Sequence, residues 1–154
     1  MKIVKHSHKG GNNAIAVGLI KDIEDGLGHI KGKLCSRCAP QLRADILDAL
    51  RHRGWSDKVR ISSNFALTLT AMNGRIALCL QTGNMARFYA DLLKLQAQFL
   101  DEKINAAIYI VPMKDAAKRM GQNMANFERM ISELKNLFDR VITVPIIILG
   151  FNDR

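Results

Sequence analysis

The amino-acid sequence predicts an α/β protein with a mixed β-sheet flanked by helices. Helical segments alternate with short apolar runs, which favours this class over an all-helical one. The Asn-Gly pair at 73–74 lies between two β-rich runs, which indicates an antiparallel hairpin. The later strands are separated by helical segments, so parallel pairs are expected in the same sheet.

The chain is expected to form a single domain over residues 1–154. Apolar residues make up 48% of it and charged residues 24%, as in ordinary globular proteins. No apolar stretch is long enough to span a bilayer, and the start M-K-I-V-K-H-S-H lacks the apolar core of a signal peptide. A cytoplasmic protein is therefore expected. The basic, glycine-containing segment 1–12 is either a flexible arm or a short strand.

Two helices are predicted before the sheet. Residues 14–27 carry an apolar stripe at helical spacing, and Gly28 follows it. Residues 40–53 have Pro40 in the first turn and Gly54 just past the end, which is the usual pattern of a helix start and stop.

Strands and helices then alternate to the end of the chain. Strand candidates lie at 58–61, 65–70 and 75–81, and the last two flank the turn A-M-N-G. The remaining predicted elements are a helix at 85–100, a strand at 106–111, a helix at 122–138 and a strand at 141–150. Pro145 in the final strand indicates an edge position or a bulge.

The charge balance predicts an acidic partner. Lys and Arg number 23 against 14 acids, a net charge of +9, which is typical of proteins that bind nucleic acid or anionic membranes. One basic cluster surrounds Trp55 and consists of Arg51, His52, Arg53, Lys58 and Arg60. A second combines charges with amides and consists of Lys114, Lys118, Arg119, Gln122, Asn123 and Asn126. Amides can contact base edges, so the second cluster is the candidate DNA-binding surface, with a solvated helix face as the alternative.

One motif identifies a family resemblance. The element order, with Q-T-G-N at 81–84 after a hairpin strand and V-P-I-I-I-L-G as the last strand, resembles the PD-(D/E)XK nuclease superfamily. Within it, residues 40–151 resemble the BglII-type restriction endonucleases. The resemblance implies a restriction endonuclease-like fold, a bacterial or archaeal cell, double-stranded DNA as the partner and a homodimer on that DNA.

The resemblance also implies a catalytic pattern that this chain lacks. In such nucleases one hairpin strand supplies an Asp. The next strand supplies an acid and, two positions later, a Lys or, in the BglII type, a Gln. The two carboxylates hold Mg²⁺ against the scissile phosphate. Here Thr70 falls near the Asp position, Cys79 at the acid and Gln81 at the Gln, and no acid occurs between Asp57 and Asp91. Thr70, Cys79 and Gln81 are thus the degenerate catalytic positions, with a buried strand residue as the alternative for Cys79.

A relocated acid could still enter the site. Asp91 lies on the helix after the motif, and Asp45 and Asp48 lie on the helix before the hairpin. These three are the candidate ligands for Mg²⁺.

Three side chains around the next helix are expected to contact DNA. Asn84 stands at the helix start, where it could bind an anion together with Gln81, cap the helix, or do both. Arg87 and Lys94 share one helix face with Asp91. Arg87 either pairs with Asp91 or contacts a phosphate.

A zinc site is a further hypothesis. Cys35 and Cys38 form C-x-x-C, and His6 and His8 form H-x-H, which together could supply four tetrahedral ligands. The spacing matches no common zinc finger, and ordinary reduced thiols are the plainer interpretation.

These observations leave three hypotheses. The first is a DNA-binding homologue of a type II restriction endonuclease, from a restriction or defence setting, with a degenerate catalytic centre. The second is an active Mg²⁺-dependent DNA endonuclease with a relocated acidic ligand. The third is a non-enzymatic protein-interaction domain that reuses the fold.

Overall fold

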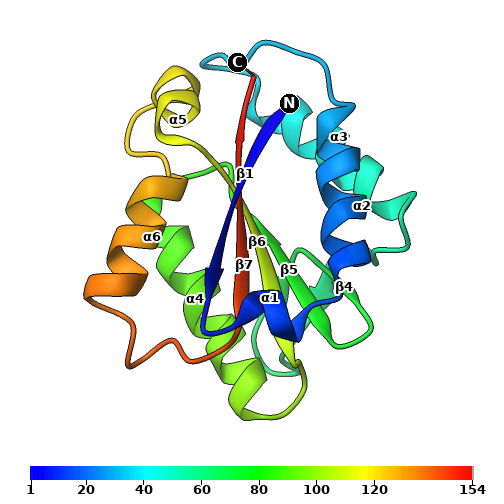
Figure 1. Cartoon of the computed structure of the whole chain (residues 1–154), viewed down its shortest axis with the longest axis vertical. Helices are drawn as coiled ribbons and strands as arrows, with labels where there is room; N and C mark the ends of the chain where they lie inside the picture. The colour runs from blue at the N-terminus through cyan, green and yellow to red at the C-terminus, as the bar shows by residue number, and fades with distance from the viewer. Residues whose placement is uncertain (154) are drawn as a thin grey trace.

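A five-stranded mixed sheet forms the centre of the molecule, with helices on both faces (Figure 1). The computed structural model describes residues 1–153. The strand order is β1-β7-β6-β5-β4, in which β5, β6 and β7 are parallel and the two outer strands are antiparallel to their neighbours. The bounds are Lys2–His8 for β1, Ala71–Asn73 for β4, Ile76–Leu80 for β5, Ala106–Pro112 for β6 and Ile146–Asn152 for β7. The predicted fold class is confirmed.

The helices form two layers. One face of the sheet is covered by α2 (Val17–Gly28) and α3 (Ala39–Arg51), and the other by α4 (Met85–Leu100) and α6 (Phe127–Asn136) (Figure 1). The remaining elements are the short helices α1 (Gly11–Ala14) and α5 (Lys114–Met120) and a separate ribbon of β2 (Val59–Arg60) and β3 (Thr68–Leu69). Within residues 1–153, no helix has the length and apolar character needed to cross a membrane.

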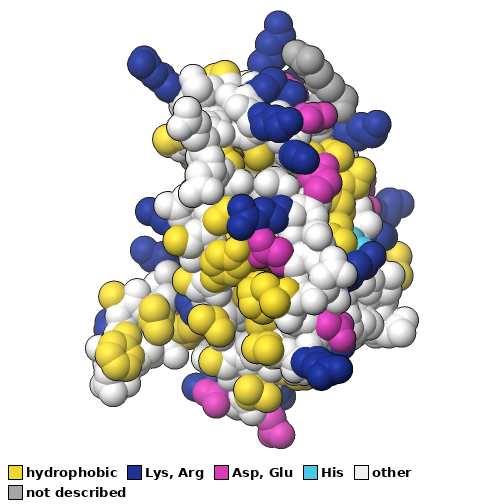
Figure 2. Space-filling model, turned by 90° about the vertical axis from the view of Figure 1, so that its left-hand side faces the viewer, with side chains coloured by type: hydrophobic (Ala, Val, Ile, Leu, Met, Phe, Trp, Pro, Cys, Tyr) yellow, Lys and Arg dark blue, Asp and Glu magenta, His cyan; other side chains and the backbone are white. Residues whose placement is uncertain are grey.

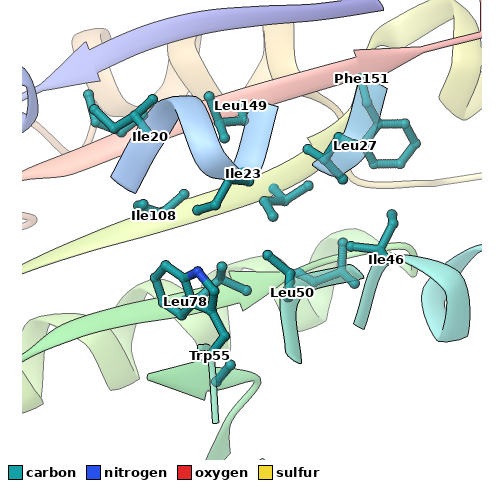
Figure 3. Packing of buried hydrophobic residues seen from close by; sticks show 14 of the residues in the cluster. Ile20, Ile23, Leu27, Ile46, Leu50, Trp55, Leu78, Ile108, Leu149 and Phe151 are labelled. Atoms are coloured by element: carbon teal, nitrogen blue, oxygen red, sulfur yellow. The ribbon is translucent and has the colours of Figure 1, made fainter. Parts of the chain in front are cut away.

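The two faces of the sheet build two separate cores because strand side chains alternate. In β5, Leu78 and Leu80 face α2 and α3, whereas Ala77 and Cys79 face α4 and α6. Figure 3 shows the first core, in which α2 and α3 pack over the strands. Its labelled side chains are Ile20, Ile23, Leu27, Ile46, Leu50, Trp55, Leu78, Ile108, Leu149 and Phe151. Cys79, one of the predicted motif positions, therefore points from β5 toward α4 and α6.

A buried glutamine fixes α4 against the chain that leads into β7. The Oε1 atom of Gln96 accepts hydrogen bonds from the backbone N–H groups of Thr143 (2.8 Å) and Val144 (3.0 Å). Its Nε2 donates to Thr143 Oγ1 at 2.8 Å. Because Gln96 is only 8% exposed and both ends of its amide are bonded, it holds the helix in one position.

The last predicted helix needs the largest correction. Residues 122–138 were expected to be helical throughout, but α6 begins only at Phe127, and Asn126 accepts a hydrogen bond from the N–H of Arg129 as its N-cap. The preceding residues instead pair with the loop before α4, where Ala125 donates to the Gly83 carbonyl at 2.9 Å. The short helix α5 was not predicted.

Two strand predictions also shift. The turn A-M-N-G was expected to join the hairpin strands, but Ala71–Asn73 is itself the strand β4, and Asn73 pairs with Ile76 around a tighter turn. Gly74 supports that turn because its φ is +55°. Pro145 precedes β7, so the expected edge position or bulge is wrong: β7 lies between β1 and β6.

The other elements agree more closely with expectation. The helix predicted at 85–100 has those bounds, and the start of the chain adopts the short-strand alternative as β1. The helix predicted at 14–27 is α2, which begins three residues later, at Val17, and the short helix α1 before it was not predicted. Gly11 begins α1 where the backbone passes close to β7: a Cβ there would lie 2.5 Å from the Ile146 carbonyl oxygen.

Replacing Gly11 by Ala should destabilise the fold by about 1–3 kcal/mol, because the backbone of β7 cannot move away as a flexible side chain could. The measurement is the urea concentration at the midpoint of unfolding, provided that the dependence of the unfolding free energy on urea is the same in both proteins. Gly18→Ala in α2 is the matched control, since a Cβ there meets no atom within 4 Å and should be neutral or stabilising by up to about 1 kcal/mol. Equal midpoints for the two variants would contradict the close-approach argument.

Candidate functional site

A pocket of about 290 Å³ lies where β5 leads into α4, and we call it the β5–α4 pocket. It is lined by Arg43, Lys58, Thr68, Leu69, Thr70, Leu80, Gln81, Thr82, Gly83, Arg87, Ala90, Asp91 and Lys94. Of the predicted site residues, it brings together Thr70, Gln81, Arg87, Asp91 and Lys94. Four cationic side chains surround a single carboxylate, so the pocket carries a strong positive excess.

The Q-T-G-N segment forms one wall through its own hydrogen bonds. Gln81 Oε1 accepts from the N–H of Gly83 at 2.9 Å, and a Cβ at Gly83 would lie 2.9 Å from the same oxygen, so a side chain at this position would crowd the turn. Asn84 caps α4 by accepting from the N–H of Arg87 at 3.3 Å. The capping alternative for Asn84 therefore holds. Gln81, at 6% exposed, bonds through both amide atoms inside the protein.

Asp91 is the acidic centre of the pocket. Its Oδ2 accepts from Gln81 Nε2 at 3.0 Å and from the hydroxyl of Tyr109 at 3.1 Å. Its Oδ1 lies 2.6 Å from Lys94 Nζ, and both charged side chains are mostly buried, at 13% and 19% exposed. Of the two alternatives for Arg87, the pairing with Asp91 is not formed, because Lys94 pairs with Asp91 instead.

This donor set does not suit Mg²⁺. A magnesium ion needs near-octahedral oxygen ligands, usually including carboxylates with free lone pairs. The pocket has one carboxylate, and three donors already bond to it. Among residues 1–153, no group of three His, Cys, Asp or Glu side chains is positioned to hold a metal ion.

The other two candidate metal ligands lie away from the pocket. Asp45 accepts a hydrogen bond from Gln41 Nε2 at 2.8 Å and lines a different depression, next to Leu42 and Cys38. Asp48 is exposed, 3.7 Å from Arg51. Helix α3 instead directs Arg43 toward the β5–α4 pocket, so neither Asp45 nor Asp48 supplies a carboxylate there.

Cys79 and Thr70, at the predicted motif positions, are both held within the fold. Cys79 is 1% exposed and packs in the core beneath α4. Burial, together with the negative charge of Asp91, raises the pKa of its thiol far above the usual range. Thr70 Oγ1 accepts from the N–H of Leu80 at 3.1 Å. The buried-strand alternative for Cys79 therefore describes its environment.

Arg43 is a pocket residue that sequence analysis did not identify. It projects from α3, donates from Nη1 to the Leu80 carbonyl at 2.6 Å and is partly desolvated, which lowers the pKa of its guanidinium. Arginine remains charged at neutral pH even so. Only the packing of α3 against the end of β5 brings Arg43 here, and periodicity on one helix cannot reveal that contact. Lys58, predicted as part of a surface cluster, also lines the pocket.

A second basic depression, of about 210 Å³, lies between α5 and α6, and we call it the α5–α6 pocket. It is lined by Lys114, Ala117, Lys118, Gly121, Asn123, Met124, Asn126 and Arg129. It unites four of the six residues predicted as the DNA-binding cluster. Gln122 is exposed on the adjoining turn. Arg119 instead turns toward the chain end, where it contacts Asn152 at 2.8 Å and Asp153.

A backbone bridge joins the two pockets, formed by residues 83–85 and 123–125. Asn84 pairs with Met124, Ala125 donates to the Gly83 carbonyl at 2.9 Å, and Met85 donates to the Asn123 carbonyl at 3.3 Å. Both pockets lie near the carboxyl ends of parallel strands, since β5 precedes one and β6 precedes the other. They thus form neighbouring parts of one basic surface.

The four residues of the zinc hypothesis lie in two separate parts of the fold. Cys35 and Cys38 are adjacent, with the Cys35 N–H donating to Cys38 Sγ at 3.0 Å. His8 is buried at the far end of β1, with Nε2 2.7 Å from the Ile142 carbonyl oxygen. His6 and His8 lie on β1, in a part of the fold that the cysteines do not reach.

The outer side of α4 carries an exposed apolar surface, which we call the apolar face (Figure 2). It consists of Leu93, Leu100, Leu137 and Val141, exposed by 63%, 69%, 67% and 57%. An apolar depression of about 140 Å³ lies within it, between α4 and the segment after α6. Contiguous apolar surface of this kind marks an interaction site more often than isolated exposed residues do.

Comparison with known proteins supports this description. A protein-family model described as restriction endonuclease BglII/BglIII matches residues 3–151. The structure of restriction endonuclease BglII complexed with a DNA 16-mer is 16% identical, with a TM-score of 0.89 over 100% of this chain and 79% of that chain. The structure of free BglII is 17% identical, with a TM-score of 0.79 over 100% and 81%. The sequence matches none of the curated proteins with which it was compared.

The three thiols should differ strongly in reactivity. Hydrogen bonding from the Arg37 backbone and from Cys38 lowers the pKa of exposed Cys35, so its thiolate should persist to lower pH than that of an ordinary cysteine. Cys79, buried and with a raised pKa, should react only after unfolding. Mass spectrometry after iodoacetamide treatment across neutral pH measures both, with Cys35→Ser to identify the fast site. Modification of Cys79 in the folded protein at the rate of Cys35 would contradict this structure.

Proposed function

The chain belongs to the restriction endonuclease BglII/BglIII family, and on that premise we propose that it is a DNA-binding homologue whose catalytic centre is degenerate. The proposed partner is double-stranded DNA, bound across the β5–α4 and α5–α6 pockets. Cationic side chains there attract phosphates, and Asn123 of the second pocket supplies an amide for base edges.

One observation carries the proposal. At the place where a nuclease of this family holds its metal, this chain has a single carboxylate that is bonded to an amide, a phenol and an ammonium group. Thr70 and Cys79 contribute no further acid. The surface around the site nevertheless keeps a strong positive charge, which suits binding of a polyanion better than hydrolysis by a metal-activated water.

The position of Asp91 beside Gln81 favours one alternative, an active Mg²⁺-dependent endonuclease with Asp91 as the relocated ligand. Lys94 would then have to leave the carboxylate. Plasmid cleavage with Mg²⁺ or Mn²⁺ that a Gln81→Ala change abolishes would support this alternative. A third possibility, a protein-interaction domain that reuses the fold, requires that duplex DNA does not bind even at low salt.

Duplex binding should weaken steeply with salt, because each phosphate contact releases a counterion. Lys118→Ala in the α5–α6 pocket should lower the slope of log affinity against log salt by about one unit, through loss of one phosphate contact. Fluorescence anisotropy of a labelled duplex at several salt concentrations measures this slope. Lys21→Ala on α2, an exposed lysine outside both pockets, is the matched control and should leave the slope unchanged.

Two results would contradict the proposal. Absence of duplex binding at low salt would leave only the protein-interaction alternative. An equal loss of slope in Lys118→Ala and Lys21→Ala would mean that the binding is a diffuse charge effect rather than a contact with the α5–α6 pocket.

We further propose that the chain binds DNA as a homodimer, with the apolar face as the contact between copies. Leu93 and Leu100 are exposed on one side of α4, and Leu137 and Val141 extend the same surface. A two-fold interface pairs a patch with itself, so an apolar patch is self-complementary in chemistry. The side chains that line the depression within this face are all uncharged, so they would not repel the same surface of a second copy.

Leu93→Asp should weaken self-association on the order of a hundredfold, because a carboxylate would be buried at the interface without a partner. Sedimentation velocity over a range of protein concentrations measures the monomer–dimer equilibrium. Val17→Asp, at an apolar residue that is 74% exposed on α2, removes a comparable side chain elsewhere and should leave the equilibrium unchanged. A wild-type chain that remains monomeric at high concentration would reject the dimer proposal.

A further inference from the structure

The cations of the β5–α4 pocket are arranged around one site rather than spread over a surface. We infer that this pocket binds a phosphate group without a divalent cation, with the Lys94 ammonium providing the positive charge that a metal ion provides in Mg²⁺-dependent nucleases. The inference rests on the proposed function only for the source of that phosphate, namely the backbone of duplex DNA.

Two contacts hold the Lys94 ammonium in the pocket. Its Nζ lies 2.6 Å from Asp91 Oδ1 and donates to the Thr68 carbonyl at 2.8 Å. These contacts tie the ammonium to α4 on one side and to the β2–β3 ribbon on the other. An ammonium group has three donors, so one N–H remains for a ligand in the pocket.

The same contacts exclude a metal ion from Asp91. A divalent cation on Oδ1 would meet the Lys94 ammonium on the same oxygen, and repulsion between close charges is strong in a partly desolvated site. The other oxygen already accepts from Gln81 and Tyr109. A metal on Oδ1 would have to displace Lys94, and a metal on Oδ2 would have to compete with Gln81 and Tyr109.

The remaining cations are free to bind the ligand. Arg43 uses one guanidinium N–H on the Leu80 carbonyl and keeps the others. Within residues 1–153, the side chains of Lys58 and Arg87 make no hydrogen bond or ion pair, although both line the pocket. Arginine suits phosphate because its planar group donates two parallel hydrogen bonds.

The start of α4 adds a further contribution. Thr82 and Gly83 line the pocket directly before the N-terminus of this 16-residue helix, where the helix dipole favours an anion. With four cations against one carboxylate, the pocket has a formal excess of three positive charges. A phosphate group would reduce this excess, whereas a divalent cation would enlarge it.

Inorganic phosphate, added to the full-length protein in the presence of EDTA, tests the inference directly. We expect saturable changes in the NMR signals of the Gly83 amide and of the Arg43 and Arg87 side chains. Lys94→Met should lower the phosphate affinity about tenfold, since it removes one charged donor and leaves Asp91 uncompensated. Lys103→Met is the matched control, because it removes a lysine paired with Asp101 at 3.3 Å outside the pocket.

Arg87→Met provides a second variant in case Lys94→Met does not fold. Arg87 is exposed and its side chain is unbonded within the described chain, so the change should preserve the fold while it weakens phosphate binding. Paramagnetic Mn²⁺ tests the cation directly: signals of Gln81 and Asp91 should not broaden selectively. Selective broadening there, or phosphate binding that appears only when Mg²⁺ is added, would overturn the inference.

The outcomes separate this inference from the proposed function. Duplex binding without phosphate-induced changes in the pocket would reject the inference and leave the DNA-binding function intact. Phosphate binding in the pocket without duplex binding would support the metal-free site and reject duplex DNA as its source. If both bind, and Lys94→Met weakens both, the pocket holds a DNA phosphate.

Discussion

The carboxylate of Asp91 is the interaction on which the arrangement of the site depends. It joins α4 to the end of β5 through Gln81 and to β6 through Tyr109, and it fixes Lys94 beside the β2–β3 ribbon. A partly buried carboxylate is costly unless donors satisfy it. The three donors meet that requirement, so one charged group ties α4, the end of β5, β6 and, through Lys94, the β2–β3 ribbon together at the pocket.

This network also shows how a pocket with a single carboxylate compensates its charge. In the pattern that the family resemblance implies, two carboxylates balance a divalent cation. Here the one carboxylate is paired with one ammonium, so the charge of Asp91 is compensated, while the pocket as a whole keeps its positive excess. Cys79, with its raised pKa, stays uncharged in the core and adds nothing to that balance. The charge of Asp91 is therefore compensated by side chains of the protein itself.

The fold class and the α4 helix could be predicted because they depend on local signals: apolar periodicity, and Asn84 as a cap. Two of the predicted motif positions, Thr70 and Gln81, line one pocket. The partners of Asp91 were not, because Lys94 competes with Arg87 on the same helix face and only the position of the Thr68 carbonyl decides between them. The loop before α6 was mistaken for helix because its residues pair with a segment about forty positions earlier, which no local pattern reveals.

The backbone bridge between the two pockets has a consequence for how such a surface can diverge. Its hydrogen bonds join main-chain atoms of residues 83–85 and 123–125, so side-chain substitutions leave it in place. The spacing between the two pockets is thus a property of the scaffold. Amides such as that of Asn123 can be exchanged for other side chains while the offset from the neighbouring pocket stays constant. Evolution could therefore alter the chemistry of the α5–α6 pocket one side chain at a time without changing its position relative to the β5–α4 pocket.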